Sequence, residues 1–157
     1  MDKSIFFEKV KEFEGFNAKA YRCPAGVLTI GYGHTEGIKQ GDVVTVAEAD
    51  NLLIGDFMDV ISKIRAYSSL LKENELYAIA DFIFNVGYER FKKSSVNKYL
   101  CEYVFAEDEN IKKTKKKLVC MMLLKYVYYT APSGAKMKSR GLMERRQWEV
   151  KVFNYGC

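Results

Sequence analysis

A glycine-rich stretch, residues 18–35, limits the fold of this chain more than any other feature. Glycine and proline both disfavour helices, whereas β-branched and aromatic residues favour strands. The stretch combines both kinds: Gly26, Gly31, Gly33 and Pro24 lie among Tyr21, Val27, Thr29, Ile30 and Tyr32. We expect a small antiparallel sheet of two or three strands, with Pro24 at the second position of a tight turn that ends at Gly26.

The second strand of this sheet is expected to run through residues 29–34. Its alternation would place Thr29, Gly31 and Gly33 on one face. The other face would hold Ile30, Tyr32 and His34. One hydroxyl followed by two positions without side chains leaves a surface that a flat ligand, such as a sugar ring, can approach closely.

Helical spacing of apolar residues dominates the rest of the chain. One helix is predicted from a Ser4 cap to Glu14–Gly15, and a capping box at Thr45–Glu48 opens another that runs to about Arg65. Everything beyond Ser69 reads as helical, apart from a loop at 130–134. Its helices are a buried central one from Asn74 to Gly87, one after Ser94–Ser95, one over about 108–128 and one over about 142–153. The predicted class is α+β, with a small β-containing lobe (15–65), a larger helical lobe (1–14 and 66–157) and a cleft between them.

Composition indicates a single globular domain. The chain has 157 residues, 48% of them apolar, with 25 Lys plus Arg against 20 Asp plus Glu. Disordered, collagen-like and coiled-coil proteins are excluded. No apolar run reaches the ~20 residues of a membrane span, and the first residues lack a signal peptide, so we expect synthesis in the cytoplasm and no stable membrane insertion. One histidine, His34, and four scattered cysteines give no metal-site spacing, and we expect neither metal nor cofactor.

Three blocks of this chain resemble the phage-type lysozymes, the endolysins that cleave peptidoglycan. The most specific is the hairpin block, Glu14-Gly15-Phe16 followed by Ala20–Thr35 (AYRCPAGVLTIGYGHT). The others are Phe82–Gly87 (FIFNVG), followed by Ser94, and Gly141–Glu149 (GLMERRQWE). The blocks keep the family's order and span nearly the whole chain, so the resemblance implies a lysozyme-like fold.

The resemblance also implies site residues. The family places a catalytic glutamate, an acidic residue nine positions later and a threonine six beyond that, and these offsets fall on Glu14, Cys23 and Thr29. Glu14 would be the general acid, in a partly buried setting that favours the neutral carboxyl. Cys23 departs from the usual aspartate and could act as a thiolate, help to hold a water, or take no part in catalysis. Thr29 would hold the attacking water, and His34 would be a supporting residue that orients the site.

Two further positions, Phe84 and Ser94, match substrate-binding positions of the family, although an aromatic residue on an apolar helix is more often part of the core. Arg145 and Arg146 with Glu149 are expected to support the fold of the last helix.

The lysine-rich run 112–117 is typical of a solvated helix face, with attraction to anionic cell-wall material as the alternative.

The function implied by the resemblance is that of a muramidase: hydrolysis of the β-1,4 bond between N-acetylmuramic acid and N-acetylglucosamine, leading to bacterial lysis. The alternatives are a lytic transglycosylase and a weak or inactive wall-binding protein. We expect a monomer with peptidoglycan as its partner and no nucleic acid ligand. Such an enzyme would reach the wall through a membrane lesion made by a holin, and the stereochemical outcome stays open.

Overall fold

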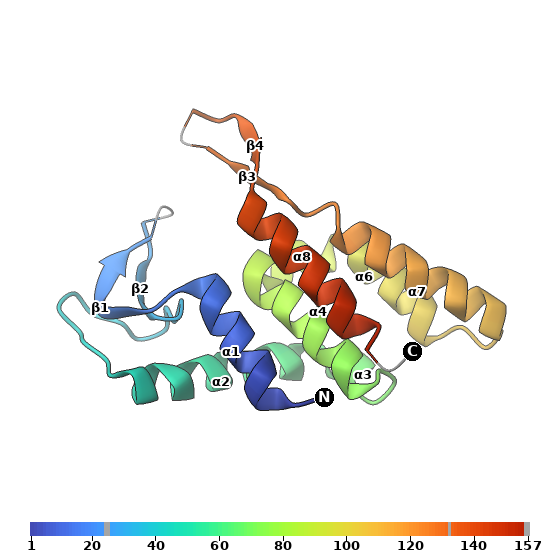
Figure 1. Ribbon diagram of the computed structural model, residues 1–157, viewed down its shortest axis with the longest axis horizontal. Helices are drawn as coiled ribbons and strands as arrows, with labels where there is room; N and C mark the ends of the chain where they lie inside the picture. The colour runs from blue at the N-terminus through green and yellow to red at the C-terminus, as the bar shows by residue number, and fades with distance from the viewer. Residues whose placement is uncertain (24–25, 132, 156–157) are drawn as a thin grey trace. The chain divides into compact units, whose positions relative to one another are not determined.

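A computed structural model describes residues 1–23, 26–131 and 133–155 of the chain (Figure 1). The expected turn position of Pro24 and the terminal Cys157 lie outside these ranges. Contacts between residues divide the chain into two compact units, Met1–Asp59 and Val60–Cys157. Helix α2 (Val46–Lys63) runs across this division.

The first unit contains helix α1 (Lys3–Glu14) and a hairpin of strands β1 (Asn17–Arg22) and β2 (Leu28–Gly31). Asp2 caps α1, because its carboxylate accepts hydrogen bonds from the backbone and side chain of Ser4 at 2.9 and 2.7 Å. The expectation of Ser4 as the cap was wrong: a carboxylate two residues before a free amide reaches it well. The predicted antiparallel sheet is confirmed, with Tyr21 opposite Thr29.

The core of this unit joins α1 to α2 through aromatic side chains. The Phe6, Phe7 and Phe57 rings meet edge to face, with centroids 5.3 to 5.8 Å apart. The capping box predicted for α2 is confirmed: Thr45 N donates to the Glu48 carboxylate at 2.7 Å, and Glu48 N donates to the Thr45 hydroxyl at 3.2 Å. The sequence therefore predicts where the chain passes from α1 into the hairpin, at Glu14–Gly15, and where it enters α2 after the hairpin.

Strand β2 is shorter than predicted. It ends at Gly31, and the chain then turns so that Ile30 pairs with His34 in an isolated bridge. The Ile30 carbonyl accepts from both Gly33 N at 3.2 Å and His34 N at 3.0 Å. The expected alternation of residues 29–34 on two faces of one strand was therefore wrong, because the positive φ angles of Gly31 and Gly33, 63° and 107°, form a turn instead.

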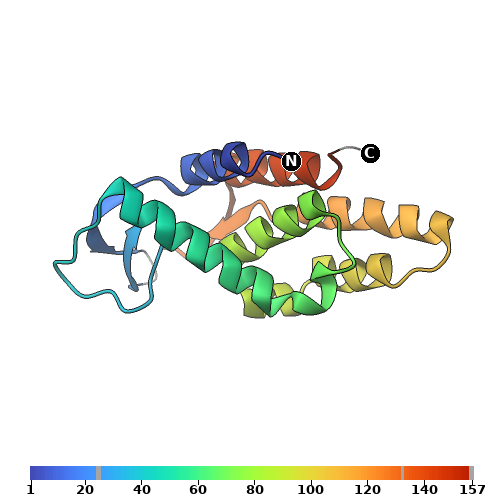
Figure 2. The same cartoon turned by 90° about the horizontal axis from the view of Figure 1, so that it is seen from below.

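The second unit is mainly helical. It comprises α3 (Arg65–Ser68), α4 (Glu73–Val86), α5 (Tyr88–Lys92), α6 (Ser95–Val104), α7 (Glu109–Leu123), β3 (Tyr128–Thr130), β4 (Lys136–Lys138) and α8 (Arg140–Phe153). Helix α4 contacts α8, and α6 and α7 lie side by side (Figures 1 and 2). Nine of the fourteen residues of α4 are buried, so the prediction of a buried central helix is confirmed.

The segment between α7 and α8 was expected to be helix followed by loop, and it is a β-hairpin. Helix α7 ends at Leu123 rather than near Tyr128, and β3 pairs with β4, with Tyr129 opposite Met137. The strands are three residues long, too short for alternation to stand out against the apolar run before them. Among the described residues, none of the helices is long and apolar enough to cross a membrane.

Candidate active site

Glu14 is the last residue of α1, at the point where the chain passes from helix into the hairpin. Its side chain is half-buried. Its carboxyl lies against the turn that follows β2: a methyl group built on the Cα of Gly33 would lie 3.8 Å from Glu14 Oε2. The helix end and the glycine turn, 19 positions apart in the sequence, thus meet, and a glycine at position 33 leaves the backbone beside the carboxyl uncovered.

Cys23 follows directly after β1 and begins the turn of the hairpin. Its carbonyl accepts from Gly26 N at 2.7 Å, and its own amide donates to Val27 O at 3.0 Å. The Arg22 guanidinium donates to the Gly26 carbonyl at 2.8 Å and closes the same turn. Cys23 forms no disulfide and its side chain is partly exposed, so a thiol is presented at the end of the sheet on a backbone fixed by hydrogen bonds.

Thr29 lies in β2, opposite Tyr21, and is 4% exposed. Its hydroxyl donates to the carbonyl of Val27 at 3.1 Å. A hydroxyl has one proton and two lone pairs, so with its proton directed at Val27 the Thr29 oxygen still has capacity to accept a hydrogen bond. This orientation suits the binding of a water molecule through one of that water's protons.

His34 is fixed from both sides of its ring. Nδ1 lies 2.9 Å from each carboxylate oxygen of Asp56, and Nε2 lies 3.0 Å from the carbonyl of Glu36. Both neighbours are acceptors, so a ring nitrogen that carries a proton donates to the acceptor that it faces. His34 thereby ties the turn after β2 to helix α2. Asp56 was not among the candidate residues, since it lies in an amphipathic helical pattern that gives no sign of a partner 22 positions away.

The predicted substrate-binding residues, Phe84 and Ser94, belong to the second unit. Phe84 is half-buried on the last turn of α4. Ser94 is buried, and its hydroxyl accepts from Asn97 N at 3.0 Å as the N-cap of α6. Glu14, Cys23, Thr29 and His34 thus all belong to the first unit, and Ser94 makes a helix-capping contact in the second.

A buried ionic cluster lies between α4 and α8. Arg145 donates to both carboxylate oxygens of Asp81, at 2.9 and 2.7 Å, and Arg146 donates to Asn85 at 2.7 Å. Glu149 lies 2.9 Å from Arg146, and burial together with the neighbouring Asp81 carboxylate raises the pKa of Glu149 well above its usual range. The expectation that the last helix uses these residues to support the fold is confirmed. Their partner Asp81 precedes the FIFNVG block and was not identified from the sequence.

Comparisons with known proteins identify the family and the fold. The family model of phage lysozyme matches residues 11–149. An endolysin of Acyrthosiphon pisum secondary endosymbiont phage 1 is 33% identical over 147 residues, which cover 92% of this chain and 91% of that protein. The muramidase domain of SpmX from Asticaccaulis excentricus superposes with a TM-score of 0.76 at 26% identity, covering 94% of this chain and 92% of the other.

A second solved structure has the same fold. The endolysin from Escherichia coli O157:H7 phage FAHEc1 has a TM-score of 0.70 at 24% identity, covering 96% of this chain and 90% of that one. The matched family range contains the hairpin and both later blocks, from the end of α1 into α8. The chain therefore belongs to the phage lysozyme family, the lysozyme-type glycoside hydrolases that act on peptidoglycan.

Proposed function

We propose that this protein is a muramidase that cleaves the β-1,4 bond between N-acetylmuramic acid and N-acetylglucosamine, with Glu14 as the general acid. The observation that carries the proposal is the closeness of the Glu14 carboxyl to the Gly33 turn. It supports an acid on a rigid helix end, next to backbone that a sugar ring can approach. The match of the family model over residues 11–149 supports the same assignment.

The reaction would begin with proton transfer from the Glu14 carboxyl to the glycosidic oxygen. The bond between that oxygen and the anomeric carbon then breaks, and positive charge develops on the sugar ring. In hydrolysis, a water adds to the anomeric carbon and loses a proton to a base. The electron pair of the broken glycosidic bond stays with the leaving oxygen, which becomes a hydroxyl. The products are two shorter glycans, one with a new reducing end.

Thr29 and Cys23 are proposed to act on the attacking water. The Thr29 proton is directed at Val27 O, so its oxygen would accept a hydrogen bond from the water and orient it. Cys23 would contribute as a thiolate or as a polar neighbour of the same water. A thiol with an unperturbed pKa of about 8.5 is only a few per cent ionised at neutral pH, so the hydrogen-bonding role needs no change in its protonation.

The test of Cys23 compares three replacements. Cys23→Ala removes the thiol, Cys23→Ser keeps a polar group of similar size, and Cys23→Asp introduces the acid usual in this family. A catalytic role predicts loss of turnover in the alanine variant and recovery in the aspartate variant. Equal turnover in the parent and the alanine variant would exclude Cys23 from the catalytic machinery.

Mass spectrometry of the digested muropeptides separates hydrolysis from transglycosylation. Hydrolysis adds one water to the products and leaves reducing ends, whereas attack by the sugar's own hydroxyl leaves anhydro ends.

Phe84 and Ser94 are proposed substrate contacts, and Phe84→Ala should raise KM more than it lowers kcat. Ser94→Ala also removes a helix cap, so its effect must be read beside a measurement of stability.

A wall-binding protein without turnover is the second candidate, and the specific observation in its favour is a thiol, rather than a carboxylate, at position 23. It predicts binding to purified sacculi with no release of reducing ends.

We also propose that the protein acts as a monomer and reaches the wall after a separate holin-like protein has opened the membrane. Similar proteins include both endolysins and SAR-endolysins. Expression with and without an agent that permeabilises the inner membrane tests the route. Lysis that needs the agent supports it, and lysis without the agent contradicts it.

A further inference from the structure

The lysine-rich run on α7, residues 112–117, is not a uniformly solvated helix face. Lys115 forms an ion pair with Glu102 of α6 at 2.5 Å. Lys116 lies 2.8 Å from the Glu75 carboxylate, and its side chain is only 16% exposed. The expectation of a simple solvated face was therefore wrong for these two lysines, because the packing of α7 against α6 turns part of the run inward.

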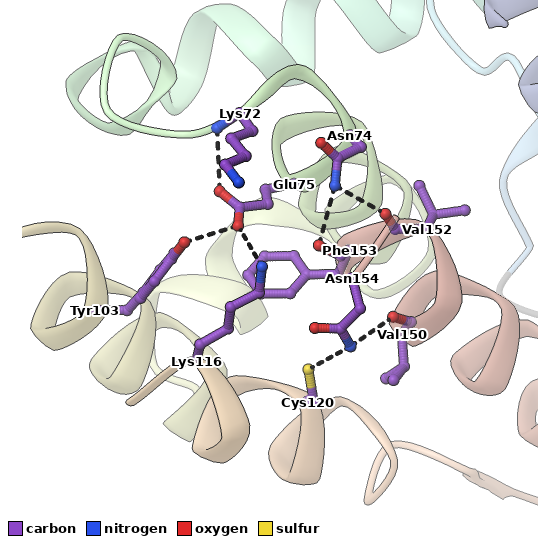
Figure 3. A network of polar contacts seen from close by, with 10 residues as sticks. All are labelled: Lys72, Asn74, Glu75, Tyr103, Lys116, Cys120, Val150, Val152, Phe153 and Asn154. Carbon is purple, nitrogen blue, oxygen red and sulfur yellow. Dashed lines mark hydrogen bonds and ion pairs between the residues drawn. The ribbon is translucent and has the colours of Figure 1, made fainter. Parts of the chain in front are cut away.

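Figure 3 shows the polar network around Glu75, which is 1% exposed. Its Oε1 accepts from the Tyr103 hydroxyl at 2.7 Å and from Lys116 Nζ at 2.8 Å, and its Oε2 accepts from Lys72 N at 3.0 Å. A buried carboxylate with three donors, one of them an ammonium group, has its charge compensated inside the protein. Glu75 thus joins the start of α4 to α6 and α7.

A hollow of about 340 Å³ lies over this network, and we call it the Glu75 hollow. Its described lining residues are Leu70, Lys72, Glu75, Tyr103, Glu109, Lys112, Lys113 and Lys116. Because Lys116 already compensates Glu75, the charges left at the rim are three lysines against one glutamate, Glu109. The Lys112 ammonium lies 6.0 Å from the centre of the Tyr103 ring, which holds it over the hollow. The result is a concave surface with a surplus of positive charge.

Helix stability accounts for these lysines only in part. Glu109 precedes Lys112 and Lys113 by three and four positions, a spacing that favours an ion pair, whereas Lys112 with Lys116 and Lys113 with Lys117 are like charges four positions apart, which destabilise a helix. Lys112 also ends the first turn of α7, where a cation opposes the helix dipole that Asp108 and Glu109 complement. The excess of lysines leaves repulsion along α7 that a ligand with negative charge would relieve.

We propose that the Glu75 hollow binds phosphate groups of a phosphodiester polymer of the bacterial envelope and so holds the enzyme on the wall. Among the described lining residues the cations are all lysines, which bind phosphate as point charges rather than through the bidentate fork of arginine. Several point charges around one hollow suit a ligand that repeats an anionic group along its chain. The choice of an envelope polymer rests on the proposed muramidase function; the anion site itself rests on the hollow.

The experiment measures binding of the full chain to synthetic poly(glycerol phosphate) at low ionic strength. The test variant, Lys72→Gln/Lys112→Gln/Lys113→Gln, removes the three rim charges and keeps Glu75, Tyr103 and Lys116. The matched control, Lys39→Gln/Lys63→Gln/Lys151→Gln, removes the same charge from exposed lysines outside the hollow. Circular dichroism checks that both variants fold.

We expect the rim variant to bind about ten-fold more weakly, because each exposed ion pair contributes a factor of about two, and the control to change less than about two-fold. Equal weakening in both variants, or no binding by the parent, would overturn the proposal. Single-stranded DNA with the same number of phosphates is the third arm. DNA binding as tight as polymer binding, with the same dependence on the rim lysines, would overturn the assignment to an envelope polymer.

Cleavage of phosphate-free peptidoglycan fragments separates this proposal from the muramidase proposal. Both triple variants should cleave the fragments at the parent rate. If the parent does not cleave them, the muramidase proposal fails, and the binding comparison still decides whether the Glu75 hollow is an anion site.

Discussion

Gly31 brings the backbone of the hairpin close to Ala49 of α2, and Gly31→Ala tests the local structure of the site. Its φ angle is 63°, in the left-handed region that disfavours side chains with a Cβ. A Cβ at this position would lie 2.9 Å from the Cβ of Ala49, which is fully buried on the first turns of α2. The substitution therefore introduces both backbone strain and a steric overlap.

The expected cost is the sum of two contributions. An alanine in the left-handed conformation costs about 1–2 kcal/mol. Overpacking a buried contact costs about 1–3 kcal/mol. We therefore expect Gly31→Ala to lower the free energy of unfolding by about 2–5 kcal/mol, a large share of the roughly 5–15 kcal/mol of a typical domain.

Urea denaturation of Gly31→Ala, Ala49→Gly and the double variant separates the two contributions. Ala49→Gly costs about 1 kcal/mol of helix propensity on its own. In the double variant the overlap disappears and the strain remains, so it should be more stable than the sum of the single effects by about 1–3 kcal/mol. A Gly31→Ala variant within about 0.5 kcal/mol of the parent, or additive effects, would refute the close approach of the hairpin to α2.

Three other contacts give further predictions. His34→Gln should lower the free energy of unfolding by about 0.5–1.5 kcal/mol, because it removes the contact with Asp56. The effect should shrink in an Asp56→Asn background, and equal effects in both backgrounds would contradict the pairing of His34 with Asp56. Asp81→Asn should cost about 3–5 kcal/mol in urea denaturation, because it leaves the Arg145 guanidinium buried without its bidentate partner, whereas a loss below about 1 kcal/mol would contradict that role. Because the pKa of Glu149 is raised in the folded protein, the free energy of unfolding should fall as pH rises from the unfolded-state pKa of about 4.3 towards the folded-state pKa. Glu149→Gln should flatten this fall in urea midpoints measured across that pH interval, and an unchanged slope would contradict the prediction.

The sequence predicted elements whose signals are local. The Thr45–Glu48 capping box, the helix after Ser94–Ser95 and the buried central helix are each encoded within a few turns of chain, and the structure confirms them. The class and the family could also be predicted, because the hairpin block carries its glycines and threonine at fixed spacing. Each of these features depends on neighbours in the chain.

The features that were missed depend on contacts between distant segments. Asp56 reaches His34 across 22 positions, and Asp81 reaches Arg145 across 64, so neither partner could be identified from local spacing. The turn at Gly33 is a local exception: its composition also fits a continuous strand, and the hydrogen bonds from Gly33 N and His34 N to Ile30 O form the turn instead. The Glu75 hollow likewise needs three helices to assemble, although its lysines stand out in the sequence.

The central claim is that the Glu14 carboxyl is the acid that protonates the glycosidic oxygen. Its direct test is the release of muropeptides from purified peptidoglycan by Glu14→Gln, with Glu12→Gln as the matched control on the exposed side of the same helix. The glutamine keeps the size of the side chain and removes the proton that the reaction needs. We expect a loss of at least about 100-fold in kcat for Glu14→Gln, with the fold intact by circular dichroism, and parent activity for Glu12→Gln. Parent activity in Glu14→Gln would contradict the account.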